Sequence, residues 1–186
     1  SVAELLSYAK AHPGSMSFGS SGLGSTGHIA GEKFRQLTGI DAVHVPYKGD
    51  APALSDVLGG QIPLAFMSIT SVIPQLNSGR MRILAVANSK RSPSIPDVPT
   101  FAQAGIKEME FATWYAIMAP AGIAKDIVNR LNQEISTALD SPDMKQSFAT
   151  HGAEPTKFTP DELGTFVSSQ LARYAGMIKE LAIRAD

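Results

Sequence analysis

A glycine-rich stretch at residues 18–28 constrains the fold of this chain more than any other feature. The apolar residues Met16 and Phe18 lead into it, and apolar residues at helical spacing follow it directly. This order predicts a strand, a tight turn and the N-terminus of a helix at about residues 26–38. Such a junction presents backbone N–H groups and the positive end of a helix dipole to a bound group, which is usually an anion.

Hydroxyl side chains are concentrated in the same stretch and suit an anionic or polar ligand. Ser25 or Thr26 can cap the helix, which leaves the other hydroxyl groups free to donate hydrogen bonds to a ligand. A histidine on the first helical turn, as His28 is, more often packs or hydrogen-bonds locally than contacts a ligand. The candidate ligand-binding residues of this turn are Ser20, Ser21, Gly22, Ser25, Thr26 and His28.

The glycine pattern leaves two alternatives open. Gly22-x-Gly24-x-x-Gly27 matches the fingerprint of a dinucleotide-binding oxidoreductase, in which Asp50 would serve as the acidic residue. Against this alternative, Asp50 is predicted to begin a helix and not to end a strand. The purely structural alternative is a turn whose glycines adopt positive φ.

Composition and charge argue against several functions. The 186 residues carry a net charge of −1 and 7% aromatic residues, which argues against nucleic-acid binding. Without cysteine, the chain has no disulfide, thiol nucleophile or cysteine-ligated zinc. The histidines lack an H-E-x-x-H spacing and the serines lack a G-x-S-x-G elbow. We therefore expect a protein that is not an enzyme and holds no metal or cofactor. No apolar run reaches the ~18 residues of a membrane span.

Alternating strand and helix patterns predict an α/β fold with a largely parallel sheet at residues 1–110. Besides the strand and helix around the glycine turn, we expect strands at about 43–47, 61–67 and 80–87, and helices at about 2–11, 50–58 and 69–76. Two polar residues end the first two of these strands, at the edge where open α/β sheets bind ligands. Tyr47, a possible wall of a cleft, and Ser68 therefore join the candidate ligand-binding residues.

Residues 111–186 have a different pattern. A β-rich run at 111–119 precedes three amphipathic helices, at about 127–139, before Gly152 and after Thr159. A lone strand cannot hide its own edges. We therefore expect it to pair with a part of the chain that this sequence lacks or with a second subunit, in a homo-oligomer or a swapped assembly.

The order of several motifs along the chain is distinctive. They are S-F-G-S-S-G at 17–22, H-I-A-G-E at 28–32, V-H-V-P-Y-K-G at 43–49, A-P-A-L-S-D-V-L-G-G-Q at 51–61, P-D-V-P-T at 96–100 and A-P-A-G at 119–122. The series covers essentially the whole chain. It resembles the Bug-type (TctC-like) periplasmic substrate-binding proteins of tripartite tricarboxylate transporters.

The resemblance implies a type II periplasmic binding protein fold, in which a cleft between two α/β lobes receives a small organic acid for delivery to integral membrane transporter subunits. Family members are longer at the N-terminus, so residues 1–110 would form the complete lobe two. Residues 111–186 would form the C-terminal portion of lobe one, without that lobe's N-terminal part. Some members carry an Asp suited to an amino group near the end of the third strand. Met67-Ser68 at this place argues against an amino-acid ligand.

Overall fold

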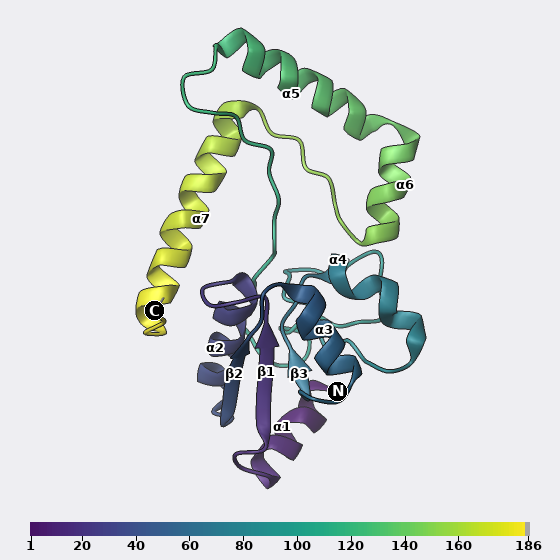
Figure 1. Ribbon diagram of the computed structural model, residues 1–186, viewed down its shortest axis with the longest axis vertical. Coiled ribbons are helices and arrows are strands. Elements are labelled where there is room, and N and C mark those ends of the chain that lie inside the picture. Colours follow the sequence, from purple (N-terminus) through teal and green to yellow (C-terminus); the bar gives the residue numbers. More distant parts are fainter. Residues whose placement is uncertain (185–186) are drawn as a thin grey trace.

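A three-stranded parallel sheet forms the centre of an N-terminal α/β unit (Figure 1). The structure is a computed structural model that describes residues 1–184. The strands lie in the order β2-β1-β3, with bounds Met16–Ser20 for β1, Ala42–Pro46 for β2 and Leu64–Ala65 for β3. Phe18 at the centre of β1 pairs in register with His44 of β2 and with Leu64 of β3. The first strand of the chain is thus the central one.

Helices lie on both faces of this sheet. Helices α1 (Val2–Ala11) and α2 (Thr26–Thr38) share one buried core with Met16 and Phe18 of β1. Because successive strand residues point to opposite faces, Gly19 faces the other side, toward Ile62 and Tyr47. Helix α3 (Asp50–Leu58) lies on that second face, in front of the sheet in Figure 1.

The structure confirms the predicted bounds of α1 and α2. The prediction succeeds because both helices have local start and stop signals. Ser1 and Glu4 form a capping box at the start of α1. Ser25 caps the N-terminus of α2, and Gly39 ends this helix in the left-handed conformation. Helix α2 also approaches β1 closely: a Cβ atom on Gly31 would collide with the ring of Phe18, so only glycine fits at this contact.

The predictions of two longer strands were wrong. The strand predicted at 61–67 is reduced to Leu64–Ala65, because the backbone N–H of Gln61 bonds to Asp56 O in the turn that ends α3. The strand predicted at 80–87 is reduced to one bridge between Val86 and Thr100. The chain between these two segments forms helix α4 (Ile69–Val72) and the 3-10 helix η1 (Ile73–Ser78).

The prediction of a strand at 111–119 was wrong. Residues 112–119 are exposed and irregular, and no strand of the described chain pairs with them. Beyond them follow α5 (Lys125–Asp140), α6 (Pro142–His151) and α7 (Pro160–Glu180), as Figure 1 shows. None of the described residues of these three helices is buried. The predicted division at residue 110 and the predicted pairing of this part with further chain or a second subunit stay predictions.

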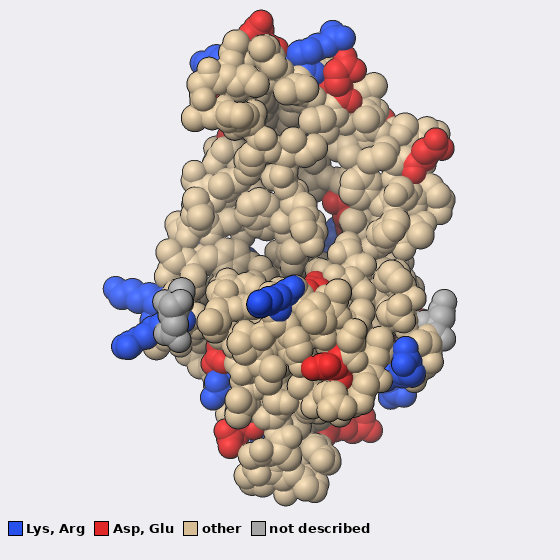
Figure 2. Space-filling model, in the orientation of Figure 1, with Lys and Arg blue, Asp and Glu red and all other residues tan. Residues whose placement is uncertain are grey.

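Helix α7 returns to the α/β unit near its C-terminal end. Lys33 of α2, although buried, pairs with Glu180 at 2.8 Å. Tyr174 and Ile178 of α7 pack against the main core. Figure 2 shows openings between the three C-terminal helices and the α/β unit, with acidic and basic side chains interspersed on the visible face. Within residues 1–184, no helix is both long and apolar enough to cross a membrane.

Candidate ligand-binding site

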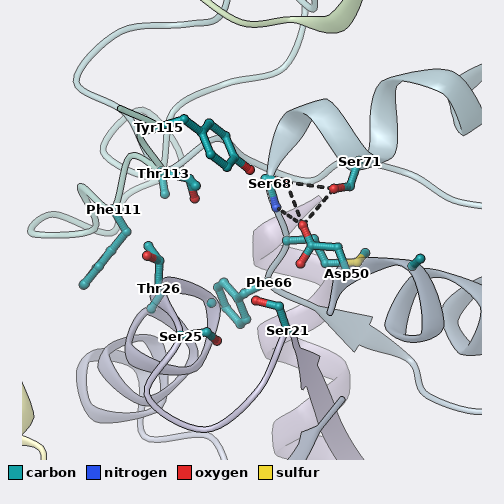
Figure 3. A pocket seen from close by; sticks show the side chains of 15 residues that line it. Ser21, Ser25, Thr26, Asp50, Phe66, Ser68, Ser71, Phe111, Thr113 and Tyr115 are labelled. Atoms are coloured by element: carbon teal, nitrogen blue, oxygen red, sulfur yellow. Dashed lines mark hydrogen bonds between the residues drawn. The ribbon is translucent and has the colours of Figure 1, made fainter. Parts of the chain in front are cut away.

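A cavity of about 630 Å³ opens at the carboxyl ends of β1 and β3. The two neighbours of β1 lie on opposite sides of it, so the connections after β1 and β2 run in opposite directions. This reversal makes a crevice beside β1, which is where open α/β sheets bind ligands. The cavity is lined by Ser21, Ser25, Thr26, Gly27, Ala30, Asp50, Ala51, Phe66, Met67, Ser68, Ser71, Ala87, Phe111, Thr113 and Tyr115 (Figure 3).

The glycine turn supplies one wall of this cavity, and its shape is held by local hydrogen bonds. Gly22 and Gly24 have φ values of 140° and 71°, which side chains rarely tolerate. Ser25 Oγ donates to Gly22 O at 2.7 Å and accepts from His28 N at 3.2 Å. Ser25, and not Thr26, is therefore the helix cap, and its hydroxyl proton is already engaged.

The free donors of this wall are two hydroxyl groups and two backbone N–H groups. The hydroxyls of Ser21 and Thr26 line the cavity and have no hydrogen-bond partner among the residues that the structure describes. The N–H groups of Thr26 and Gly27 lie in the first turn of α2, where no intrahelical acceptor exists. This arrangement suits a carboxylate, which accepts strong hydrogen bonds from such donors.

Ser20 and His28 lie beneath the turn and do not line the cavity. Ser20 is fully buried, and its Oγ lies 2.7 Å from His44 Nε2. His28 Nδ1 accepts the hydrogen bond of the Gly24 N–H at 3.0 Å. Both residues therefore hold the turn in place, which is the local role expected of such a histidine. His44, which now joins them, was not a candidate from sequence because its partners are distant along the chain.

Burial and neighbouring charges perturb both imidazoles. Burial lowers the pKa of His28, although Glu32 opposes this effect. Burial, with smaller contributions from His28 and Arg35, lowers the pKa of His44 from 6.5 to about 4. Both rings are therefore neutral at ordinary pH, as acceptance of a hydrogen bond by His28 Nδ1 requires.

Gly22 and Tyr47 also lie outside the lining of the cavity. The N–H of Gly22 donates to Ser20 Oγ at 3.2 Å, so this glycine shapes the turn. The hydroxyl of Tyr47 donates to Asp56 Oδ2 at 2.6 Å on the second face of the sheet. This hydrogen bond raises the pKa of Tyr47. The structure therefore places Tyr47 against α3.

Ser68 lines the cavity together with Asp50, which sequence reasoning considered only for the dinucleotide alternative. Asp50 Oδ2 accepts from Ser68 N at 3.1 Å, Ser68 Oγ at 2.6 Å and Ser71 Oγ at 2.8 Å. Asp50 begins α3 and is occupied by these serines, unlike the strand-end acid of a dinucleotide site. An acidic residue therefore does lie beside Ser68, but it comes from the start of α3 and not from the end of the third strand.

Aromatic residues complete the cavity, and sequence reasoning missed this role for them. Phe66 follows β3, while Phe111 and Tyr115 come from the segment after the α/β unit. Figure 3 shows Thr113 and Tyr115 across the cavity from the glycine turn. Trp114 is 37% exposed and lies edge-on to Phe166, with the ring centroids 5.3 Å apart.

Comparison with known proteins decides the family. The model of the tripartite tricarboxylate transporter family receptor (TctC) matches residues 1–183. This chain belongs to that family. It is 37% identical to Protein BugT of Bordetella pertussis, over 97% of this chain and 55% of the relative. The chain thus spans about half the length of this TctC-family relative.

Solved structures of TctC-family proteins share the fold. R. palustris Rpa4515 with adipate matches at a TM-score of 0.93 and 37% identity, over 98% of this chain and 61% of that one. MatC (Rpa3494) from Rhodopseudomonas palustris with bound malate matches at a TM-score of 0.80 and 29% identity, over 95% of this chain and 61% of that one. The predicted periplasmic binding protein fold is therefore confirmed, with a coverage that fits one lobe and part of the second.

Proposed function

We propose that this chain forms one wall of an organic-acid site in a periplasmic solute-binding receptor, which acts without catalysis and delivers its ligand to the membrane subunits of a tripartite transporter. The observation that carries the proposal is the cavity at the carboxyl ends of β1 and β3, where Ser21, Thr26 and the first turn of α2 present free donors. The carboxylic acids bound by the two similar solved proteins support it.

The chemistry of this wall suits a receptor that must also release its ligand. The 15 residues that line the cavity include no Lys, Arg or His. A carboxylate would be held by hydroxyl and N–H donors, in hydrogen bonds that are charge-assisted by the ligand alone. Release then breaks no ion pair with a protein cation.

Isothermal titration calorimetry tests this proposal on the protein purified as its full reading frame encodes it. The panel comprises aliphatic mono-, di- and tricarboxylates and aromatic acids. We expect saturable binding of at least one acid, with a matching rise in melting temperature because the ligand binds only the folded state. Binding of none of the acids would contradict the proposal.

NAD and NADP titrations provide the matched test of the dinucleotide alternative. Trp114 is the single tryptophan of the 186 residues, and its fluorescence reports on a segment whose residues Thr113 and Tyr115 line the cavity. We expect no saturable change with either nucleotide. A saturable change with either nucleotide, together with binding of none of the acids in the panel, would favour the dinucleotide-binding alternative.

A further inference from the structure

A carboxylate side chain lies in the same cavity as the donor wall. Asp50 begins α3, and in Figure 3 it lies on the other side of Phe66 from Thr26. Its Oδ2 atom accepts all three hydrogen bonds from the backbone of Ser68 and the hydroxyls of Ser68 and Ser71. These bonds hold the carboxylate in one orientation in the cavity.

The other oxygen of this carboxylate is available to a ligand. Oδ1 of Asp50 has no hydrogen-bond partner among the residues that the structure describes. An ionised carboxylate accepts hydrogen bonds at both oxygens and donates none. No Lys, Arg or His among the lining residues offsets its charge. The cavity therefore combines donors near Ser21 and Thr26 with an open acceptor at Asp50.

We propose that Asp50 is a specificity-determining residue, which selects organic acids that carry a hydroxyl or ammonium donor beside the carboxylate held by the glycine turn. This inference rests on the proposed function and names its ligand class. The donor of a hydroxy acid or an amino acid would bind Oδ1. A carboxylate or an apolar group placed there would be disfavoured, because like charges repel and an apolar group leaves a desolvated oxygen unpaired.

A purely structural role for Asp50, as the acceptor that orders Ser68 and Ser71, is separable from this one. In Asp50→Asn, the remaining side-chain oxygen can still accept the bonds of both serines. The new amide nitrogen then takes the place of Oδ1 and presents a donor where the cavity had an acceptor. The variant keeps the local structure and inverts the chemistry that faces the ligand.

Calorimetry with matched acids tests the inference on the protein as its full reading frame encodes it. The first series is succinate, malate and aspartate, and the second is adipate and 2-aminoadipate. We expect the wild type to bind the donor-bearing acid of at least one series about tenfold or more tightly than the plain acid, which is the range for a hydrogen bond to a charged group. Asp50→Asn should abolish or reverse this preference.

Asp56→Asn is the control, because Asp56 lies on the same helix outside the cavity and bonds to Tyr47. It should keep the wild-type preference, and melting curves should show all three proteins folded. If the wild type binds the acids without preferring those that carry a hydroxyl or ammonium donor, or if Asp50→Asn keeps the preference, the inferred role of Asp50 is overturned. The proposed function would still stand. Binding of no acid by the wild type would overturn the proposed function and this inference with it.

Discussion

The imidazole rings of His28 and His44 stack face to face beneath the glycine turn, with centroids 3.8 Å apart and planes inclined by 7°. The ring of His44 also stacks on that of Phe18 in the central strand, with centroids 4.9 Å apart. Through these contacts, the turn that borders the cavity is tied to β1, β2 and α2 at once. Two cationic rings at this distance would repel each other, so the arrangement depends on neutral histidines.

We predict that the protein loses stability in mildly acidic solution because of this pair. The pKa of His44 is about 4 in the folded chain against an ordinary value of 6.5, and that of His28 is also lowered. The unfolded chain therefore binds more protons in this window, and the free energy of unfolding falls as the pH decreases from about 6.5 toward about 4. Urea unfolding at about pH 7 and about pH 5 measures the loss.

Two variants assign this loss to its source. His44→Gln removes one titrating ring, so its free energy of unfolding should fall less between the two pH values than that of the wild type. His151→Gln is the control, because His151 is exposed at the end of α6. It should retain the wild-type dependence. An undiminished loss in His44→Gln would show that the stacked pair is not the cause.

We predict that Ser25→Ala weakens both folding and ligand binding. It removes the cap of α2 and the hydrogen bond to Gly22, so the free energy of unfolding should fall by about 1 kcal/mol. Acid affinity should fall as well, since Thr26 and the first-turn N–H groups lose their fixed position. Urea unfolding and calorimetry measure the two effects.

Ser141→Ala is the matched control for this prediction. Ser141 caps α6 through the N–H of Met144, at 3.4 Å, and does not line the cavity. Its loss should lower stability by no more than about 1 kcal/mol and leave acid affinity unchanged. Equal affinity losses in the two variants would argue against a positioning role for Ser25.

We predict opposite effects for two Gly→Ala substitutions in helices. A Cβ atom on Gly31 would lie 2.6 Å from Phe18 Cδ2 in a filled core, so Gly31→Ala should cost about 1–3 kcal/mol of stability. A Cβ atom on Gly176 in α7 would meet no neighbouring atom within 4 Å, so Gly176→Ala should stabilise by about 0.5–1 kcal/mol. Thermal unfolding compares them. A neutral Gly31→Ala would contradict the close packing of α2 on β1.

Sequence reasoning succeeded where the determinants are local. The caps at Ser1 and Ser25 and the stop at Gly39 each act within one or two turns of the chain, and the helix bounds that they set are confirmed. Residues 112–119 show the opposite case. Their apolar, β-rich composition predicts a strand, but a strand requires a pairing neighbour, and the described chain places none beside them.

The candidate site was partly predictable for the same reason. The turn residues Ser21 and Thr26 come from one contiguous stretch, and they line the cavity together. Asp50 and Ser68 are 18 residues apart, and only the folding of α3 against β3 brings them into contact. The stacking of His28 on His44 likewise needs the packing of α2 against β2. No local signal in the sequence predicts such pairs.

The most direct measurement of the central claim is the acid affinity of Thr26→Val, compared with that of the wild type. Valine keeps the shape of threonine and removes the hydroxyl that faces the cavity. Thr38→Val is the matched control at the other end of α2, where the hydroxyl bonds only to Phe34 O. With the best acid of the panel, we predict that Thr26→Val binds about tenfold more weakly and Thr38→Val binds as the wild type does. Equal affinities in all three proteins would contradict the assignment of the glycine turn as the carboxylate-binding wall.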